Sequence, residues 1–390
     1  MANVDKLYYD ITFSNRNQEE TISNPVKFIE TRSIPFLHNP SLYYMSIIRF
    51  SLDTDSLPVF IPVIQPKQPD INLTIYSISM SYKVAGVDVV VRTYIKFIPQ
   101  NLIATLPTPP SQTVDGFQDD SSGYYYIYNY QAFIYMMNVA FEECYQELAL
   151  QVGLLGGTLP TPHAPVMEFD SSDKFVVING DIVGYASNLP NPIILYMNNN
   201  CGQLFASLPM FINANSSPQG LNFRIAFSVF GGSTQIDFPV SNPTYIAIQC
   251  WTEANVTAIW SPVQSVVFTS SLLPIVANQL SEPTILNNGA NISSNGNNAN
   301  FGQIITDMMV DQEVGWRPAI LYNPTAEFRL VEMIGNVPLY SIDVDVYWKN
   351  RQGKLIAFRL VPGGCCTMKI LFTRKKNLLI QDIGGTKFTH

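Results

Sequence analysis

Apolar and polar residues alternate along several stretches of the chain. The clearest stretch is 341–349, where every second residue is apolar: Ile342, Val344, Val346 and Trp348. A period of two is typical of antiparallel strands that bury one face. Similar stretches begin near residues 43, 73, 87, 244, 257, 318, 340 and 366, with 354–361 as an extra or connecting piece. The pattern therefore predicts a mainly β protein.

The alternation also predicts which side chains of the early strands are buried. Residues 44–53 place Ile48, Phe50 and Leu52 on one face, and residues 73–83 place Tyr76, Ile78, Met80 and Tyr82 on one face. After a turn at Ala85 and Gly86, residues 87–97 alternate in the same way. We expect these three strands to belong to one sandwich.

The pattern changes after residue 98. Residues 98–123 are rich in Pro, Ser, Gln and Asp, which predicts a loop. Asn129 is a good helix cap, and apolar residues follow at helical spacing: Phe133, Met136, Met137, Ala140, Cys144 and Leu148. Short apolar stretches between turn residues fill 154–240. We expect 99–240 to be an inserted, mixed α/β domain with one long helix at about 130–152.

The eight expected strands, joined by long connections, fit a single antiparallel jelly roll made of two facing sheets. The jelly roll would consist of residues 41–98 and 241–380, with the inserted domain between the strands that begin near 87 and 244. Residues 1–40 are polar and interrupted by prolines, which indicates an N-terminal arm, and 381–390 is expected to be a tail. Removing 1–38 should then leave the core folded and weaken docking into a larger assembly.

The composition favours a protein whose surface meets partners. Only 13% of the 390 residues are charged, 47% are hydrophobic, and the formal net charge is −8. An acidic chain of this kind does not bind nucleic acid over its whole surface. We expect no signal peptide and no membrane span, since no apolar run approaches about 20 residues. The five cysteines show no paired spacing, which favours reduced, packed thiols.

Signals for catalysis are weak. The three histidines are His38, His163 and His390, and none lies on an expected strand. A metal site in a jelly roll needs several histidines and a carboxylate from neighbouring strands. The sequence contains neither a nucleophile elbow nor a phosphate-binding glycine motif. We expect no enzyme activity, no metal and no cofactor.

One charged segment differs from the rest. Between residues 349 and 376 there are eight basic residues and no acidic one: Lys349, Arg351, Lys354, Arg359, Lys369, Arg374, Lys375 and Lys376. This segment predicts either a genome-facing basic surface that attracts phosphate or a solubilising sheet face whose basic edges prevent wrong strand pairing. Both interpretations stay open here.

Two blocks of sequence resemble a known family. The block NPSLYYMSIIRFSLDTDSLPVFIP (39–62) is similar to the N-terminal region of the minor capsid, or penton, proteins of virophages and Polinton-type elements. The block 314–376 resembles the end of the same proteins, above all in its strand 342–349, its NRQGK turn and its closing KILF strand. The resemblance covers both flanks of the chain, and the middle matches only through the helix.

The resemblance implies a structural capsid protein of the Sputnik type. In that family we expect one jelly roll per subunit, a homopentamer at each icosahedral vertex of the virion, and trimers of the major capsid protein as neighbours. It also implies a domain inserted between two jelly-roll strands. Assembly would take place in the host cytoplasm, and packaged DNA could contact the inner face without sequence specificity.

Other classes of protein fit the same pattern. A carbohydrate- or receptor-binding β-sandwich could stack sugars on the tyrosines of 124–130. A double-jelly-roll major capsid protein would need more strands than the chain provides outside the insertion. A jelly-roll hydrolase or oxygenase is the third alternative, against which the scarcity of histidines argues.

Overall fold

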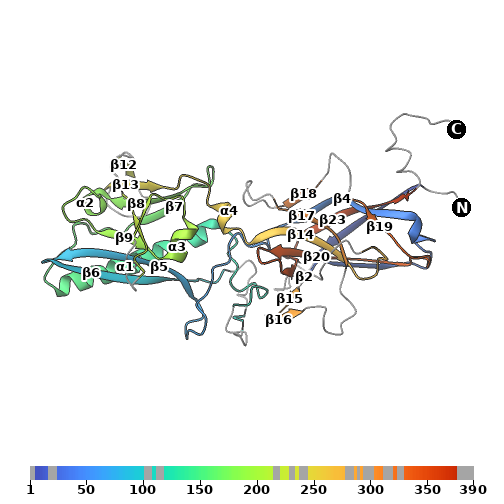
Figure 1. Cartoon of the computed structure of the whole chain (residues 1–390), viewed down its shortest axis with the longest axis horizontal. Coiled ribbons are helices and arrows are strands. Elements are labelled where there is room, and N and C mark those ends of the chain that lie inside the picture. Colours follow the sequence, from blue (N-terminus) through green and yellow to red (C-terminus); the bar gives the residue numbers. More distant parts are fainter. Residues whose placement is uncertain are drawn as a thin grey trace.

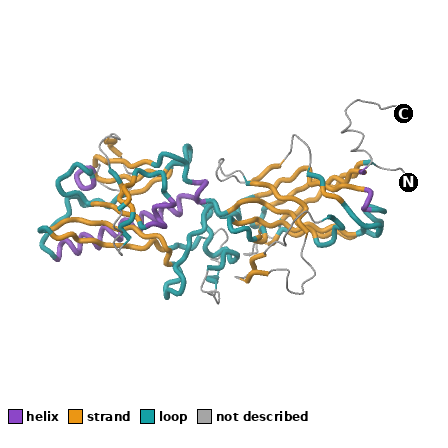
Figure 2. The backbone as a smooth tube through the Cα atoms, in the orientation of Figure 1, coloured by secondary structure: helices purple, strands orange, loops and turns teal. Residues whose placement is uncertain are grey.

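The computed structural model describes residues 5–15, 24–100, 108–110, 118–213, 220–227, 233–236, 245–276, 285–287, 290–292, 303–310, 319–322 and 329–375. The chain forms two lobes that lie end to end (Figure 1). Each lobe has its own cluster of buried apolar side chains. We call them the sandwich lobe and the α/β lobe. The sandwich lobe consists of strands and loops with one short 3-10 helix, whereas the α/β lobe also contains the long helix (Figure 2).

The sandwich lobe contains two sheets that face each other. The first has the order β1-β23-β4-β18, with β19 also pairing with β4: β1 (Lys6–Ser14), β4 (Tyr43–Asp53), β18 (Ala319–Tyr322), β19 (Val331–Glu332) and β23 (Cys365–Arg374). The second has the order β16-β15-β21-β20-β14-β17, with β3 on β20: β3 (Lys27–Thr31), β14 (Val263–Ser270), β15 (Ile285–Asn287), β16 (Ala290–Ile292), β17 (Gln303–Met309), β20 (Ser341–Asn350) and β21 (Leu355–Ala357). A small pair, β2 (Asn24–Pro25) with β22 (Arg359–Leu360), and the 3-10 helix η1 (Pro40–Leu42) complete the lobe.

The inward faces of the two sheets form the core of the sandwich lobe. The expected alternation in β20 is confirmed, because Ile342, Val344, Val346 and Trp348 are all buried in this cluster. Across the interface, the ring of Phe50 in β4 lies 5.0 Å from the ring of Phe268 in β14. Burying such aromatic and branched side chains between two sheets is what holds a sandwich together.

One detail of β4 differs from the expected pattern. Ile47, not Ile48, is buried with Phe50 in the core, and Ile48 is only half-buried. The pairing of β4 with β23 shifts register between Lys369 and Ile370. A β-bulge of this kind adds a residue to one strand and reverses the side chains that follow it. Period-two reasoning assumes an uninterrupted strand, so it chose the wrong isoleucine.

The α/β lobe is built from two further antiparallel sheets and helix α1. One sheet has the order β10-β11-β9-β5-β6: β5 (Leu73–Val84), β6 (Val87–Lys96), β9 (Ile194–Met197), β10 (Met210–Ile212) and β11 (Phe223–Ile225). The other has the order β12-β13-β8-β7: β7 (Val166–Phe169), β8 (Val176–Asp181), β12 (Ser233–Ile236) and β13 (Tyr245–Trp251). Within the described residues, three short helices accompany them: α2 (Ile182–Tyr185), α3 (Asn199–Leu204) and α4 (Thr257–Trp260).

The prediction of one long helix is confirmed by α1 (Tyr130–Leu154). The side chain of Asn129 accepts a hydrogen bond of 2.8 Å from the backbone N–H of Ala132, as an N-cap should. The apolar positions expected on one face, among them Phe133, Met137 and Leu148, are buried. This face packs against β5, β6 and β7, so α1 joins the two sheets of the lobe into one core.

The strands expected at 73–83, 87–97 and 244–251 do not belong to the sandwich. Instead β5 and β6 pair with each other and with β9, and β13 pairs with β8 and β12. Their buried side chains lie in the α/β cluster, which spans residues from Val59 to Trp260. The expected limits of the inserted segment, 99 and 240, were therefore too narrow. Alternation shows that a strand buries one face, but not which neighbour covers it.

The prediction of an N-terminal arm is wrong for the described residues. Strand β1 pairs with β23 along its whole length, from Lys6 opposite Thr373 to Ser14 opposite Cys365. Strand β3 pairs with β20. Side chains from both ends of this segment, Ile11 and Phe36, are buried in the sandwich core. Removing 1–38 would therefore take two strands out of the sandwich. The expected tail, 381–390, lies outside the described residues.

Tyrosines at the junction join the two lobes. Tyr124 and Tyr125 are buried in the α/β cluster, whereas Tyr126 is buried in the sandwich cluster and lies 6.0 Å from the ring of Trp348. These rings are packing residues, so they are not the exposed sugar platform considered above.

The junction also holds a carboxyl, Asp120, whose backbone carbonyl accepts a hydrogen bond from the hydroxyl of Tyr126. Burial raises the pKa of Asp120 to about 6, and the charge of Lys354 partly opposes this shift.

The pairing of β1 predicts how a single substitution affects stability. Ile11→Ala should lower the free energy of unfolding by about 2–5 kcal/mol, because it leaves a cavity in the sandwich core. Thr12→Ala, at the exposed position next to it, should change it by no more than about 0.5 kcal/mol. Denaturant titration of both variants checks this. Equal stability of the two would contradict the placement of β1 in the sandwich.

Candidate assembly surfaces

Three loops meet at the end of the sandwich lobe that lies away from the α/β lobe. We call residues 32–42, 271–276 and 333–340 the distal loops. Strand β4 leads into the α/β lobe from its C-terminal end, so its first residue, Tyr43, marks the opposite end (Figure 1). Backbone hydrogen bonds tie the loops together: Ser41 donates to Gly335, Phe36 to Leu339, and Ile334 to Pro274. The three segments therefore form one surface.

The distal loops expose large apolar side chains. Val337 is 79% exposed and Ile34 is 69% exposed, and four more contribute: Leu42, Leu272, Ile334 and Tyr340. We call these six residues the apolar tip. A single exposed apolar residue is ordinary, whereas a group of them on adjoining loops marks a surface that meets a partner. Sequence reasoning missed this surface, because the loops are far apart in the chain and their apolar residues do not alternate.

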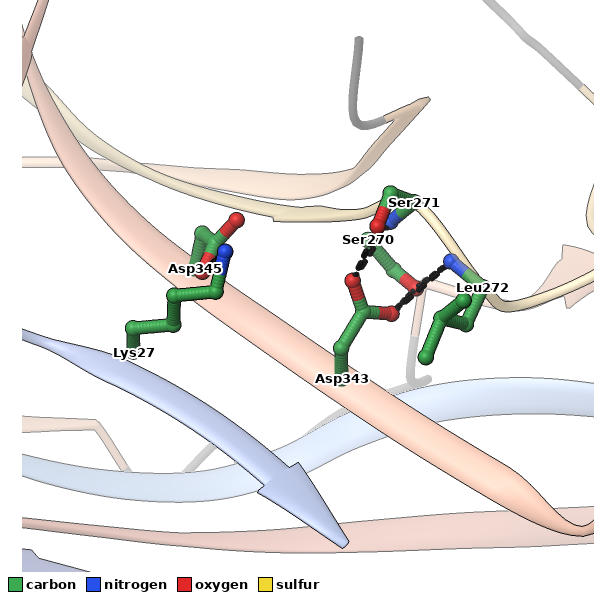
Figure 3. Close-up of polar contacts among 6 residues, drawn as sticks. All are labelled: Lys27, Ser270, Ser271, Leu272, Asp343 and Asp345. Atoms are coloured by element: carbon green, nitrogen blue, oxygen red, sulfur yellow. Dashed lines mark hydrogen bonds and ion pairs between the residues drawn. The ribbon is translucent and has the colours of Figure 1, made fainter. Parts of the chain in front are cut away.

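A buried carboxylate holds one distal loop in place. Asp343 lies on β20 and is only 1% exposed. Its carboxylate accepts hydrogen bonds from the Ser271 backbone N–H at 2.8 Å, the Ser271 hydroxyl at 2.6 Å, the Leu272 backbone N–H at 2.9 Å and the hydroxyl of Ser270 (Figure 3). Carboxylates that accept several N–H and O–H donors make strong hydrogen bonds. Asp343 thus fixes the turn that presents Leu272 at the apolar tip.

The environment of Asp343 favours its charged form. Burial by itself would raise the pKa of this carboxyl, but the hydrogen bonds from Ser270, Ser271 and Leu272 outweigh burial and lower it below 3.8. Its neighbour on the same face of β20, Asp345, behaves differently. Burial raises the pKa of Asp345, although the ammonium of Lys27 lies 3.8 Å from it (Figure 3). Asp343 is therefore the carboxylate that holds the loop, and Asp345 contributes less to the stability of the fold.

The free edges of the two sheets form two further surfaces. Phe50 of β4 faces Phe268 of β14, and β1 contacts β3, so the sheet orders place β1 and β3 on one side of the sandwich and β17 and β18 on the other. Within the described residues, each side exposes large apolar groups: Tyr8 and Ile29 on the first, Met309 and Leu321 on the second. Unpaired strand edges with exposed apolar groups are ready to pack against another subunit.

The eight basic residues do not form one face. Lys349, Arg351 and Lys354 surround the turn after β20, where the Arg351 guanidinium donates to the carbonyl of Ala258 near the junction. Lys369 lies on β23, in the other sheet, and Arg359 is exposed on β22. Arg374 ends β23 opposite Tyr43, the first residue of β4, and Lys375 follows it. Lys376 is outside the described residues.

Acidic partners within the chain bind two of these cations. Lys369 lies 3.3 Å from Asp10, and Lys375 lies 2.7 Å from Glu332. The Lys375 ammonium also lies over the ring of Tyr44. Exposed pairs of this kind contribute little to stability, but they lower the local positive charge. The geometry therefore does not provide the single basic wall that the sequence suggested.

The remaining chemical candidates pack in the interior. Cys144, Cys201, Cys250 and Cys366 are buried, and burial raises the pKa of each thiol. Of the adjacent pair, Cys366 points inward and Cys365 is half-buried, as expected for packing residues. Across the described ranges, no group of three or more His, Cys, Asp or Glu side chains is arranged to hold a metal ion. None of the helices described is both long and apolar enough to cross a membrane.

Comparison with known proteins identifies the family. The model of the Sputnik minor capsid protein V18/19 family matches residues 7–374. The chain belongs to this family. It is 35% identical over 150 residues to uncharacterized protein V18 of Sputnik virophage, a match that covers 38% of this chain and 87% of that protein. It is 29% identical over 211 residues to structural protein V19 of Sputnik virophage, covering 53% of this chain and 93% of that protein.

Solved structures agree with this membership. A chain in the cryo-EM structure of the Sputnik virophage superposes with a TM-score of 0.76 at 28% identity, covering 96% of this chain and 99% of that chain. The mavirus penton protein superposes with a TM-score of 0.58 at 15% identity, covering 95% of this chain and 99% of that chain, which shows a shared fold. The sequence-based assignment to virophage minor capsid proteins is confirmed. This chain is a structural capsid protein of the virion.

The hydrogen bonds of Asp343 predict a pH-dependent contribution to stability. Asp343→Asn should lower the free energy of unfolding at pH 7 by about 2–3 kcal/mol, because buried donors lose their acceptor. A carboxyl with a lowered pKa stabilises the fold above its ordinary value of 3.8 and loses this effect as the pH falls through its folded pKa. The difference between the two proteins should therefore shrink below pH 3.8.

Chemical denaturation at several pH values measures this difference. Asp88→Asn, which makes the same change at an exposed position of β6 in the α/β lobe, serves as a control and should follow the wild type. A difference between Asp343→Asn and the wild type that stays constant down to pH 3 would contradict the role of the charged carboxylate.

Proposed function

We propose that this capsid protein is a penton: a homopentamer at the icosahedral vertices, bounded by major-capsid trimers. The main support is the strand order of the sandwich. Taken in chain order, β1, β3, β4, β14, β17, β18, β20 and β23 can be numbered one to eight. With the short strands β15, β16, β19 and β21 left aside, the two sheets then have the orders 1-8-3-6 and 2-7-4-5. This order supports an eight-stranded jelly roll, a fold that capsid subunits use.

In this jelly roll the α/β lobe is an insertion between the third and fourth strands. The chain leaves the sandwich after β4 and returns at β14. The pentameric ring is a heterologous assembly, so each subunit must offer two different complementary surfaces. The β1/β3 side and the β17/β18 side of the sandwich meet this requirement, with Tyr8 and Ile29 of one subunit against Met309 and Leu321 of the next.

The apolar tip fits the second set of contacts. It lies at the end of the jelly roll away from the insertion, and permanent interfaces have apolar centres. We assign it to the contact with the neighbouring major capsid protein, because the two sides of the sandwich are used within the ring. Asp343 keeps this surface in its docking conformation before assembly, which reduces the entropy lost on binding.

Two weaker expectations remain predictions. Contact with packaged DNA would have to use separate small groups of cations, chiefly Lys349, Arg351 and Lys354, since Lys369 and Lys375 are paired with carboxylates. Assembly in the host cytoplasm is consistent with five cysteines that are not disulfide-bonded.

A structural role leaves no need for catalytic residues, and the capsid family supports that role.

The mass of the native assembly tests the penton proposal. The purified full chain should form a particle of five times 43.6 kDa in native mass spectrometry, or should do so when added to major capsid protein. Leu321→Asp, on the β17/β18 side, should reduce the pentamer to monomers without unfolding the subunit. A trimer, or a pentamer that Leu321→Asp and Met309→Asp leave intact, would contradict the proposed ring.

Docking of the apolar tip is tested separately. Val337→Asp should leave the pentamer intact and reduce its incorporation into particles at least about tenfold, a loss of about 1.4 kcal/mol per contact. Val87→Asp is the matched control, since Val87 is 58% exposed at the start of β6 in the α/β lobe. Quantitative analysis of purified particles gives the ratio. Equal incorporation of both variants would show that the apolar tip does not dock.

A further inference from the structure

The sheet β12-β13-β8-β7 has an outer face that the core does not use. On its inner face, Val176, Ile178 and Ile248 are buried in the α/β cluster. The residues between them point to the other side, because side chains alternate along a strand. That outer face carries Glu168 on β7, Asn179 on β8, and Gln249 and Trp251 on β13. The strand registers place Gln249 beside Asn179, and Trp251 and Glu168 on either side of Val177.

A chain of hydrogen bonds crosses this face from strand to strand. The Trp251 indole N–H donates to Gln249 Oε1 at 3.1 Å, the Gln249 amide donates to Asn179 Oδ1 at 2.9 Å, and the Asn179 amide donates to the Glu168 carboxylate at 3.0 Å. All donors point the same way, so each bond polarises the next. The chain fixes the orientation of four side chains and ends on a carboxylate. It crosses three strands, so it is not a local capping motif.

The two ends of the chain are exposed to solvent, and its centre is not. Trp251 is 42% exposed and Glu168 is exposed, whereas Asn179 is completely buried. The fold does not need an indole at this position, because Trp251 is absent from the α/β core. An exposed aromatic ring held by a polar neighbour is typical of recognition surfaces, since it offers a large apolar area with little side-chain entropy to lose.

The chemistry of this face matches a sugar better than a protein or nucleic acid. A pyranose ring has one apolar C–H face, which packs on an indole, and a rim of hydroxyls, which need both donors and acceptors. Gln249 provides amide donors next to Trp251, and Glu168 provides a carboxylate acceptor on the other side of Val177. Among these four side chains the only charge is negative, which disfavours phosphate. An apolar protein interface would lack the buried polar chain.

We infer that this outer face, formed by Glu168, Asn179, Gln249 and Trp251, binds an uncharged saccharide unit of a glycan. It belongs to the lobe that lies outside the jelly roll, so the inference does not depend on the pentamer. In an assembled shell, it would give the capsid protein a second activity, attachment to a glycan-bearing surface. The stacking residue is Trp251, and Gln249 and Glu168 bind the hydroxyls.

Saturation-transfer NMR with the full chain tests the inference, using a panel of neutral oligosaccharides of hexoses, N-acetylhexosamines and deoxyhexoses chosen from a glycan array. At least one should bind, and Trp251→Ala should weaken it at least about tenfold. Trp251→Phe, which keeps a ring, should retain part of the affinity, and Glu168→Gln should weaken binding while leaving the acceptor for Asn179. Tyr135→Ala, at a 60% exposed aromatic of α1, is the control and should bind like the wild type.

Two outcomes would overturn the inference. The first is that no neutral saccharide binds, including the case in which only a protein or a sialylated glycan is captured. The second is that saccharides bind equally well to Trp251→Ala and to the control. Circular dichroism and native mass spectrometry of each variant show whether the fold and the assembly state are unchanged, so a loss of binding is not confused with unfolding or with failure of the pentamer.

Discussion

The sandwich depends on the pairing of the last described strand, β23, between two strands from the start of the chain. β23 is hydrogen-bonded to β1 on one side and to β4 on the other. Its inward residues, Cys366, Met368, Ile370 and Phe372, fill the middle of the core. Neither β1 nor β4 can bury its apolar face in the sandwich before the C-terminal segment has paired with it. The rest of the sandwich lobe, including both free edges and the distal loops, is positioned by this closure.

The α/β lobe is largely independent of that closure. Its apolar cluster contains α1 and strands from two sheets, and no side chain of β23 belongs to it. The junction is narrow: Tyr126 enters the sandwich core while its neighbours Tyr124 and Tyr125 stay in the other cluster. Such an arrangement allows the α/β lobe to be large without disturbing the two sheets of the sandwich lobe. It also allows the α/β lobe to carry a surface of its own.

The surfaces of the protein divide by physical character. The distal loops and the two sides of the sandwich expose apolar groups such as Val337 and Leu321, which suit permanent contacts with other capsid subunits. The outer face of the β7–β8–β13 sheet instead presents a connected polar chain and one indole, which suits a small hydrated ligand. Positive charge is scattered and partly neutralised within the chain, so it does not dominate either surface.

The sequence by itself determined the elements whose signal is local. Period-two alternation identified β20, including its four inward residues, and helical spacing with an Asn cap identified α1. The blocks at 39–62 and 314–376 identified the family, and they contain β4, β20 and β23, which pair and pack within the sandwich lobe.

Only the tertiary structure decided what depends on partners far along the chain. It assigned the β5–β6 hairpin to the second lobe, because an alternating strand does not specify the surface that covers it. It also showed that the expected arm contains β1 and β3, which pair with β23 and β20. Most outer residues of these two strands are polar, so the sequence of the segment does not look like that of buried strands. The apolar tip and the polar chain at Trp251 likewise arise from residues that only folding brings together.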